Sequence, residues 1–436
     1  MTALQNPRFR GALLIGAAVP ISVLYLWRTV VLPLAAGSLP GDIAGNYLPA
    51  AARIAAGRDP YQVSVPTSGY VPLPLAGPLY ITPPPVAWML QPLLHVSPTV
   101  FVAVVVFALQ LSLVVFIATS LRALRITSRQ MALLLVLVAI AYEPVAANID
   151  EGQINLVLLA LSGVWLLGWV AGDAWWGGVA LGAGVVLKLL QGPAGLLVLW
   201  GRRWRMLLGA IGAGAVLSAL AVPQYLPEYV LKIAPLLASG TGLFENHSPG
   251  GTIIRLFDPA TFTGAARDTP PLARAITVAI ALAVLAVTFA VLRRPSAQRS
   301  GRALEAAAIV AAGPLVASYS WGTHLVLLLL PMFVLLDWAI RRRDWQVTGL
   351  VAAGWLLIGP GHNYFQTLLV SGYSNLAVLR VMGEFGVVAI TLIWAAALIA
   401  VRRERSADGA DAADEQGADR EEDDRAREHH AVTEVR

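Results

Sequence analysis

Long apolar blocks recur along almost the whole chain and decide which fold classes are open to it. Each block is near the length of about 20 residues that an α-helix needs to cross a bilayer. Charged residues make up 13% of the 436 residues and hydrophobic residues 57%, whereas about a quarter of a soluble domain is charged. We therefore expect an all-α polytopic membrane protein. Its apolar blocks cover residues 11–34, 99–121, 131–147, 153–171, 175–200, 205–222, 273–292, 303–320, 324–340, 346–359 and 383–401.

The block at 175–200 is interrupted by polar residues. Lys188, Gln191 and the Gly192-Pro193 step do not belong in the middle of a lipid-facing helix. We expect two short helices to meet there, which gives about twelve membrane segments in all. This division places the short arginine-rich loops on one side, which the positive-inside rule assigns to the cytoplasm. Those loops hold Arg8/Arg10, Arg122/Arg125/Arg129, Arg202/Arg203/Arg205, Arg293/Arg294/Arg299/Arg302, Arg341/Arg342/Arg343 and Arg402/Arg403/Arg405.

The longer connections then fall on the outer face of the plasma membrane, together with most of the unusual polar residues. We expect a transmembrane domain over residues 1–403, with its functional site on this outer, periplasmic side. Residues 404–436 are mostly Asp, Glu, Ala, Gly and Arg, a composition typical of a disordered tail, here in the cytoplasm. The outer connections are residues 35–98, 143–152, 223–272 and 360–382.

Two amphipathic pieces in the first outer connection are expected to lie flat on the membrane. Residues 46–56 turn Tyr47 and several alanines toward lipid and Arg53 toward headgroups or phosphates. Residues 83–95 begin with prolines, which a helix tolerates in its first turn. Asp42 precedes the first piece, so we expect it to be held close to the bilayer surface.

Six short motifs follow one another within residues 40–345, and most of them lie in or beside the outer connections. In chain order they are Asp42 with Tyr47, Ala51 and Ala52 and the turn Gly57-Arg58-Asp59-Pro60-Tyr61; Ile81-Thr82-Pro83-Pro84-Pro85; Gly152-Gln153-Ile154-Asn155; Lys188 with Pro193; Asn246-His247-Ser248 with Arg255; and Ser320-Trp321-Gly322-Thr323-His324.

In this order the motifs resemble those of the GT-C class of polytopic glycosyltransferases, which use polyprenyl-phosphate sugars. They are similar above all to the actinobacterial branch that includes the phosphatidylinositol-mannoside mannosyltransferase. Three positions depart from that pattern: Thr82 replaces a Tyr, His247 a Gln, and Thr323 the first of two His. The resemblance implies a GT-C-like bundle of about 11 to 12 spans with outer interfacial helices. It also implies transfer of mannose from a polyprenyl phosphate donor to a lipid-linked glycan, such as a phosphatidylinositol mannoside or lipoglycan.

Such a transfer needs a base for the attacking hydroxyl and cations for the phosphate leaving group. We expect Asp42 to be the general base of an inverting reaction, with His324 as a second catalytic residue. The expected donor phosphate and lipid ligands are Arg255, Lys188, His247 and Arg53. The expected sugar and acceptor ligands are Tyr47, Gln153, Asn155, Asn246 and Trp321.

Several of these residues also have a purely structural interpretation. Asp42 would cap the interfacial helix, Lys188 would snorkel to the membrane surface, and Arg255 would contact lipid headgroups. In the same interpretation three more residues serve helix ends, namely His324 as an interfacial anchor, and Gln153 and Asn155 as hydrogen-bond partners of their own helix terminus.

No cofactor or metal is expected. The adjacent pair Asp150-Glu151 offers fewer oxygen ligands than a metal ion requires. The sequence has no glycine-rich nucleotide loop, and with no Cys it has no thiol nucleophile and no Cys metal ligand. The formal charge of +5 comes mostly from loops that set topology and does not indicate a nucleic-acid partner. The expected partners are the donor, the lipid-linked acceptor and membrane lipids.

Two rival functions stay open. An arabinofuranosyltransferase that uses decaprenyl-phosphate arabinose would share the same chemistry. A lipid flippase or secondary transporter would instead show charges paired in the bundle centre and two repeated halves with matched broken helices. The sequence has one broken segment and gathers its polar residues toward one face, which favours an enzyme.

Overall fold

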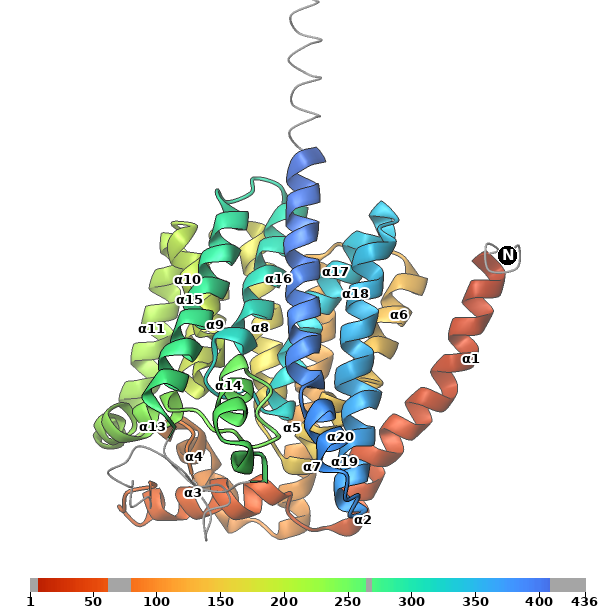
Figure 1. The fold of residues 1–436 in the computed structure, drawn as a ribbon. Coiled ribbons are helices and arrows are strands. Elements are labelled where there is room, and N and C mark those ends of the chain that lie inside the picture. Colours follow the sequence, from red (N-terminus) through yellow and green to blue (C-terminus); the bar gives the residue numbers. More distant parts are fainter. Residues whose placement is uncertain (1–6, 62–79, 264–268, 408–436) are drawn as a thin grey trace, which may run out of the picture.

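The computed structural model describes residues 7–61, 80–263 and 269–407, and every regular element in those ranges is helical. Most of the helices stand side by side in one bundle, while shorter helices lie across one end of it (Figure 1). The prediction of an all-α polytopic membrane protein is confirmed for this part of the chain.

Five helices in the described ranges are long and apolar enough to cross a membrane. They are Leu13–Ala36, which joins α1 (Pro7–Leu26), η2 (Trp27–Val31) and α2 (Leu32–Ala36); α5 (Pro98–Ala123); α15 (Pro271–Leu292); Gly322–Arg342, which joins η9 (Gly322–Leu328) and α17 (Leu329–Arg342); and Leu376–Ala407, which begins with α20 (Leu376–Gly383). The sequence predicted about twelve segments. The two numbers differ because the remaining segments are bent, broken or short.

Two further spans result if each of two bent helix pairs is counted as one. The pair α6 (Arg129–Ile140) and α7 (Glu143–Glu151) bends by 48°, and α11 (Trp204–Leu220) bends by 99° into the helices of Pro223–Ala238. Other helices are α8 (Asn155–Ala171), α13 (Ala234–Ala238), α14 (Pro249–Phe257), α16 (Arg299–Val316), α18 (Trp345–Leu356) and α19 (His362–Val370). Residues 143–152, 223–263 and 360–382, expected as outer connections, are therefore largely helical.

The predicted break in 175–200 is confirmed. α9 (Trp175–Leu187) ends at Lys188, and after the short η5 (Leu189–Gln191) the chain continues as α10 (Gly192–Trp200). Both ends of this hairpin lie near the last turn of α8, because Asp173 accepts hydrogen bonds from the backbone of Met206 and Arg203 stacks over the Trp169 ring. The 13 residues of α9 rise about 20 Å, less than the apolar thickness of about 30 Å. α9 is therefore too short to cross this thickness on its own.

Glycines let the hairpin pack tightly against α11. A Cβ at Gly178 would lie 1.8 Å from the Met206 carbonyl oxygen, and one at Gly182 would lie 2.1 Å from that of Ala210. Small residues four apart allow two helix backbones to approach closely in a membrane. Any larger side chain here would push α9 away from α11 and move the turn at Lys188.

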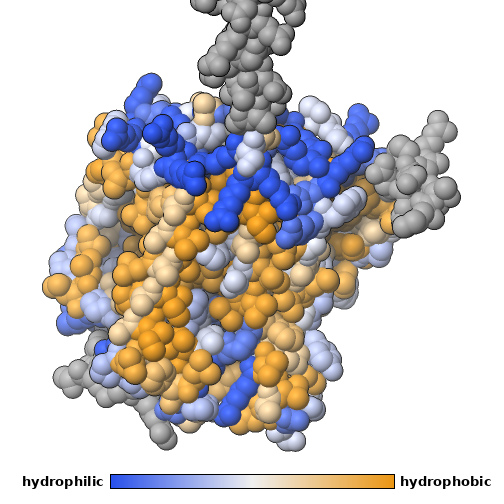
Figure 2. All heavy atoms as spheres, turned by 45° about the horizontal axis from the view of Figure 1, so that its top comes forward, coloured by the Kyte–Doolittle hydropathy of each residue, from blue (hydrophilic) through white to orange (hydrophobic). Residues whose placement is uncertain are grey.

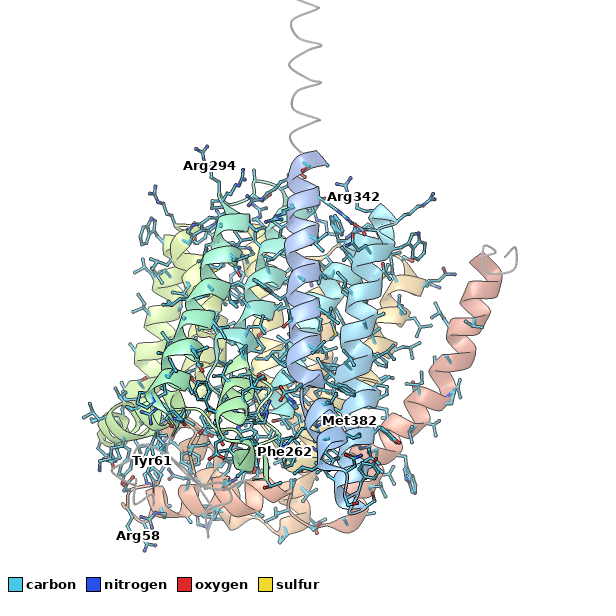
Figure 3. All side chains as sticks on the ribbon, in the orientation of Figure 1. Arg58, Tyr61, Phe262, Arg294, Arg342 and Met382 are labelled. Carbon is cyan, nitrogen blue, oxygen red and sulfur yellow. The ribbon has the colours of Figure 1, made fainter. Side chains whose placement is uncertain are left out.

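The two ends of the bundle differ in composition. Arg294 and Arg342 extend from one end, and Arg58, Tyr61, Phe262 and Met382 lie at the other (Figure 3). Figure 2 shows hydrophilic side chains gathered at the arginine-bearing end, above a broad apolar band. We call these the basic end and the α3 end.

The interfacial helices predicted in residues 35–98 are confirmed as helices. They are η3 (Ile43–Tyr47) with α3 (Leu48–Ala55), and α4 (Pro84–Leu90) with η4 (Gln91–His95). α3 runs across the end of the bundle in Figure 1. Residues 62–79 of this connection lie outside the described residues.

The last helix continues to Ala407, four residues past the boundary expected between residues 403 and 404. Glu404 is buried and accepts hydrogen bonds from Trp338 Nε1 at 2.8 Å and from Arg342 at 2.9 Å. These contacts tie the end of the helix to α17. The rest of the expected tail, residues 408–436, lies outside the described residues.

Candidate active site

The α3 end contains a cavity of about 1110 Å³. Its walls come from segments far apart in the sequence, including η3, the junction of α7 and α8, the turn of the hairpin, the loop before α14, the start of η9, and α19. Seven of the eleven site residues predicted from the sequence line it: Asp42, Tyr47, Gln153, Lys188, His247, Trp321 and His324.

Asp42 stands directly before η3 and is half-buried. Its Oδ1 accepts a hydrogen bond of 2.8 Å from Asn46 Nδ2, and its Oδ2 accepts one from Gln153 Nε2. The Asp42 side chain does not cap η3. The carboxylate is thus held by two side-chain amides at the cavity wall, and the structural interpretation of Asp42 as a helix cap does not apply.

Gly152 explains why Gln153 reaches Asp42. It ends α7 with φ of 69°, a left-handed conformation that favours glycine. A Cβ on Gly152 would also lie 2.5 Å from Ile43 Cδ1 and 2.9 Å from Pro40 Cβ. The missing side chain lets the junction of α7 and α8 touch the segment that carries Asp42.

Lys188 lies at the turn of the α9–α10 hairpin and faces the cavity. Its Nζ donates to Gln153 Oε1 at 3.2 Å and to Asn155 Oδ1 at 3.0 Å. Arg28 is the other Lys or Arg residue among the described cavity residues, and its guanidinium is bound by Glu143 and Asp150. Lys188 forms no ion pair with a described residue, so its charge is available to a ligand.

Asn155 and Tyr47 support this arrangement from behind. Asn155 is fully buried, does not line the cavity, and donates to Asn148 Oδ1 at 2.9 Å, which orients its own oxygen toward Lys188. The Tyr47 hydroxyl donates to Gln153 Oε1 at 2.9 Å. Gln153 therefore accepts from both Lys188 and Tyr47 while it donates to Asp42, and this pattern fixes the orientation of its amide.

His324 and Trp321 form the wall contributed by η9. The His324 ring is 6% exposed, and its Nδ1 accepts a hydrogen bond of 3.3 Å from the Trp321 backbone N–H. In a neutral ring this leaves the proton on Nε2. The burial of His324 at the cavity does not match an interfacial anchor in contact with lipid.

Arg255 does not line the cavity. Glu384 binds its guanidinium through Nε at 2.8 Å and Nη2 at 2.9 Å, while Nη1 donates to the carbonyl oxygens of Leu243 and Asn246 at 3.0 Å each. These contacts occupy the cation within the protein. The expectation that Arg255 binds donor phosphate is therefore not supported by its position.

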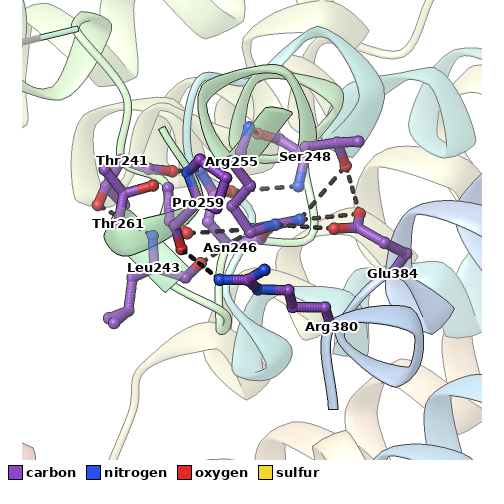
Figure 4. Close-up of polar contacts among 12 residues, drawn as sticks. Thr241, Leu243, Asn246, Ser248, Arg255, Pro259, Thr261, Arg380 and Glu384 are labelled. Atoms are coloured by element: carbon purple, nitrogen blue, oxygen red, sulfur yellow. Dashed lines mark hydrogen bonds and ion pairs between the residues drawn. The ribbon is translucent and has the colours of Figure 1, made fainter. Parts of the chain in front are cut away.

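Two further predicted residues are engaged elsewhere. Asn246 is fully buried, with its amide bonded to backbone groups on both sides (Figure 4). Arg53 donates to the backbone oxygen of Asp59 and lies outside the cavity wall. Both stabilise local backbone in this structure.

Several residues of the cavity wall are not among those predicted from the sequence. Arg28 lies within the first apolar block, where a charged residue indicates a functional role or a paired charge. Its partners Glu143 and Asp150 lie two turns apart on one face of α7, and Asn363 donates to Glu143 at 3.1 Å. The other missed wall residues include Glu151, Glu245, His362 and Gln366.

Burial sets the charge of three groups outside the spans. It raises the pKa of Glu245, and the neighbouring Asp42 raises it further. It lowers the pKa of His247 well below the usual value and that of His362 to about 4. Both imidazole rings are therefore neutral at pH 7. The His247 and His362 rings meet edge to face, with centroids 5.1 Å apart.

The chemistry available in this cavity is that of one carboxylate oriented by two amides, one cation without an ion-pair partner, further acidic residues that include Glu151 and Glu245, and several neutral hydrogen-bonding groups. No group of three or more His, Asp or Glu residues suited to a metal ion occurs among the described residues. A reaction with a developing negative charge near Lys188 and a proton to be taken by Asp42 would use both charged groups.

The family model of glycosyltransferase family 87 matches residues 80–318, which is more than half of the chain. The match defines a membrane glycosyltransferase, since the same residues form apolar helices of the bundle. The chain belongs to glycosyltransferase family 87. The prediction of a glycosyltransferase is confirmed, whereas the choice of mannose is not.

Individual relatives match over smaller regions. Two proteins named alpha-(1->3)-arabinofuranosyltransferase, from Mycobacterium tuberculosis strains CDC 1551 and H37Rv, are 38% identical over 92 residues. The aligned part is 20% of this chain and 21% of each relative. Among solved structures, ArnT from Cupriavidus metallidurans bound to undecaprenyl phosphate covers 92% of this chain and 79% of its own, with 16% identity and a TM-score of 0.40.

Proposed function

We propose that this family 87 member transfers a sugar from a polyprenyl phosphate donor to a hydroxyl of a lipid-linked glycan, within the cavity at the α3 end. The observation that carries the proposal is the linkage of Asp42 and Lys188 through one amide, Gln153. This linkage puts a base and a cation on one wall of a single cavity. Transfer from a phosphate-linked sugar needs both.

Lys188 is the proposed ligand of the donor phosphate. It projects from the turn between α9 and α10, two short apolar helices, and an unpaired charge among apolar helices is costly and is kept for function. A phosphate attached to a polyprenyl chain would reach it from the lipid side. His324 is proposed as a second residue at the phosphate, because it lines the cavity and lies close enough to Lys188 for their charges to interact.

The lipid chain of the donor requires apolar surface next to this phosphate. Leu189, Leu190 and Pro193 of the hairpin line the cavity beside Lys188, and Ala234 and Leu237 of the α13 segment line it as well. This apolar lining supports a prenyl donor over a nucleotide sugar.

Asp42 is the proposed general base. It takes the proton of the acceptor hydroxyl as that oxygen attacks the anomeric carbon, while the carbon–phosphate oxygen bond breaks and the phosphate leaves with the bonding electrons. Attack opposite the leaving group inverts the anomeric configuration. No step needs a metal, and we expect a chelator to leave the rate unchanged.

Two sugars are proposed, in order. Mannose follows from the resemblance of the six motifs to the mannosyltransferase branch. Arabinofuranose is the second candidate, and the 92-residue match to relatives named as arabinofuranosyltransferases favours it. The cavity wall is compatible with either sugar, since both present neutral hydroxyls.

The proposed location of the reaction is the outer face of the plasma membrane. The basic end carries Arg294 and Arg342, and the positive-inside rule assigns such an end to the cytoplasm (Figure 3). The α3 end then faces outward, where lipid-linked glycans are extended.

Purified protein in detergent tests the function, because no transport gradient exists there and a flippase would yield no product. The substrates are decaprenyl-phosphate arabinose or a polyprenyl-phosphate mannose, with an alkyl glycoside as acceptor. We expect labelled glycoside product from one donor, and Lys188→Ala should lower the rate on the order of 10²-fold with a raised donor KM. Absence of product from both donors would overturn the proposal.

A further inference from the structure

A loop between α13 and α14 forms part of the cavity wall. It is far from Asp42 and Lys188 in the sequence. It covers residues 241–248, and its members Leu243, Phe244, Glu245 and His247 line the cavity. The loop contains one hydrogen-bonded turn, in which the Asn246 N–H donates to Leu243 O at 2.9 Å, and the His247 N–H donates to Ser320 O at 2.8 Å. Buried side chains add further hydrogen bonds to this backbone framework.

Asn246 is one of the side chains that hold this loop. Its Nδ2 donates to Thr241 O at 2.8 Å and Ser318 O at 3.0 Å, and its Oδ1 accepts from the N–H groups of Ser248 at 3.1 Å and Ser320 at 3.0 Å. Both amide hydrogens and the amide oxygen are thus used on backbone. Because Asn246 points into the protein, its two neighbours in sequence are turned to the cavity.

Arg255 is the second side chain that holds the loop. It joins the carbonyl oxygens of Leu243 and Asn246 to the carboxylate of Glu384, which lies within the last candidate span, Leu376–Ala407 (Figure 4). The Arg255 side chain is 6% exposed and that of Glu384 28%. A cation sequestered in this way acts on the loop and has no direct route to a ligand in the cavity.

The two polar side chains that the loop presents to the cavity, Glu245 and His247, are suited to sugar hydroxyls. Glu245 offers carboxylate oxygens that accept O–H donors. His247 is 1% exposed at the cavity wall, and neither ring nitrogen makes a well-directed hydrogen bond within the described residues, although the Gly383 backbone lies near the ring. A buried, neutral imidazole in this position gains a hydrogen bond from a ligand that brings a hydroxyl.

The position of Glu245 argues against the donor phosphate as its ligand. Glu245 and Asp42 lie close enough for their charges to interact. An anionic phosphate next to this carboxylate would be repelled, whereas a neutral acceptor would not. The acceptor must also touch Asp42, since Asp42 takes its proton in the proposed function.

We propose that loop 241–248 is the subsite for the acceptor sugar, with Glu245 and His247 bound to its hydroxyls and with Asn246 and Arg255 as positioning residues. This inference rests on the proposed function and names the part of the cavity that selects the acceptor. It places an uncharged glycan against the loop and leaves the phosphate to Lys188.

Binding without turnover tests the subsite. The full chain in lipid nanodiscs is titrated by calorimetry with octyl α-D-mannopyranoside, octyl α-D-arabinofuranoside and decaprenyl phosphate, each alone. Glu245→Gln and His247→Ala should each weaken binding of a glycoside about three- to tenfold, the range of one or two lost hydrogen bonds, and leave decaprenyl phosphate binding unchanged. Lys188→Ala should do the opposite.

Two further variants distinguish the loss of a carboxylate in the loop from the loss of a carboxylate elsewhere and from a change in the shape of the loop. Glu228→Gln changes a carboxylate that pairs with Lys232 outside the cavity wall, and it should alter neither ligand. Arg255→Ala should weaken the glycoside alone, although Arg255 touches no ligand. Loss of decaprenyl phosphate binding in Glu245→Gln, or unchanged glycoside binding in both loop variants, would overturn the subsite. Since no transfer is measured, an inactive protein with the expected binding would overturn only the proposed reaction.

Discussion

Lys188 Nζ lies 3.2 Å from Gln153 Oε1, and the amide nitrogen of the same Gln153 donates to the carboxylate of Asp42. One neutral side chain thus orients both the cation of Lys188 and the carboxylate of Asp42. The order of donors and acceptors is fixed, because Lys188 only donates and an ionised Asp42 only accepts. An amide is the side chain that satisfies both partners at this position.

Gln153→Glu tests this linkage with a change of one atom. A carboxylate there would pair with Lys188 and repel Asp42, which removes the free cation and displaces the base. We expect a loss of activity on the order of 10²-fold or more, comparable to the removal of an electrostatic stabiliser. Steady-state rates with varied donor measure it. The control is Gln346→Glu at the basic end, where Gln346 contacts Arg403 and an added acid is tolerated.

Arg255→Ala is expected to act through stability and the acceptor. Removal of one partner of a buried ion pair costs about 3 to 5 kcal/mol at full burial, and the partial exposure of Glu384 places the loss toward or below the lower figure. The unfolding midpoint should fall, and the acceptor KM should rise while the donor KM stays near that of the unchanged protein. A raised donor KM with an unchanged acceptor KM would return Arg255 to the phosphate site predicted from the sequence.

Much of the fold is predictable, because a long apolar block in a bilayer must satisfy its backbone hydrogen bonds internally and therefore forms a helix. The division of 175–200 at Lys188 follows from a charge, an amide and a Gly-Pro step within one block, and the structure places the break there. The helical character of 143–151 and 362–370 is not predictable in the same way. These segments are polar because they line a cavity, so their composition imitates that of loops.

The candidate site is predictable where a residue type is unusual in its surroundings. Lys188 in an apolar block and Asp42 at a membrane exit both reach the cavity. The same logic fails for Arg255, because a cation near outer loops binds backbone and Glu384 just as well as phosphate. Arg28 and Glu143 were missed because their pairing joins segments 115 residues apart, which no local pattern reveals.

The raised pKa of Glu245 predicts a pH dependence of acceptor binding. The charged groups around it are Asp42 and Glu151, which disfavour its ionised form, with Lys188 beside them. As the pH falls, Glu245 takes up its proton earlier than an ordinary glutamate, and the charge-assisted hydrogen bond to the sugar weakens. Glycoside affinity should therefore fall as the pH is lowered toward the range in which glutamates titrate, and the fall should begin at a higher pH than for an exposed glutamate. Glu245→Gln should bind weakly at every pH across that range, and an identical decline in this variant would assign the titration to another group.

The sidedness of the molecule is measurable with single cysteines, since the chain contains none. Arg294→Cys and Arg58→Cys place exposed thiols at the basic end and the α3 end (Figure 3). In intact cells an impermeant maleimide should label position 58 and leave position 294 unlabelled until the membrane is opened. Labelling of 294 alone would reverse the topology and put the cavity in the cytoplasmic half.

Asp42→Asn tests the central claim most directly. The variant keeps the size and polarity of the side chain but has no base, and its single carbonyl oxygen can accept from Asn46 or from Gln153 but not from both. The account predicts a protein that inserts and binds decaprenyl phosphate like the unchanged chain, with transfer slowed about 10² to 10⁴-fold. The measurement is the single-turnover rate of sugar transfer at saturating donor and acceptor, beside donor binding in the same preparation. A rate within a few-fold of the unchanged protein would contradict the assignment of Asp42 as the base.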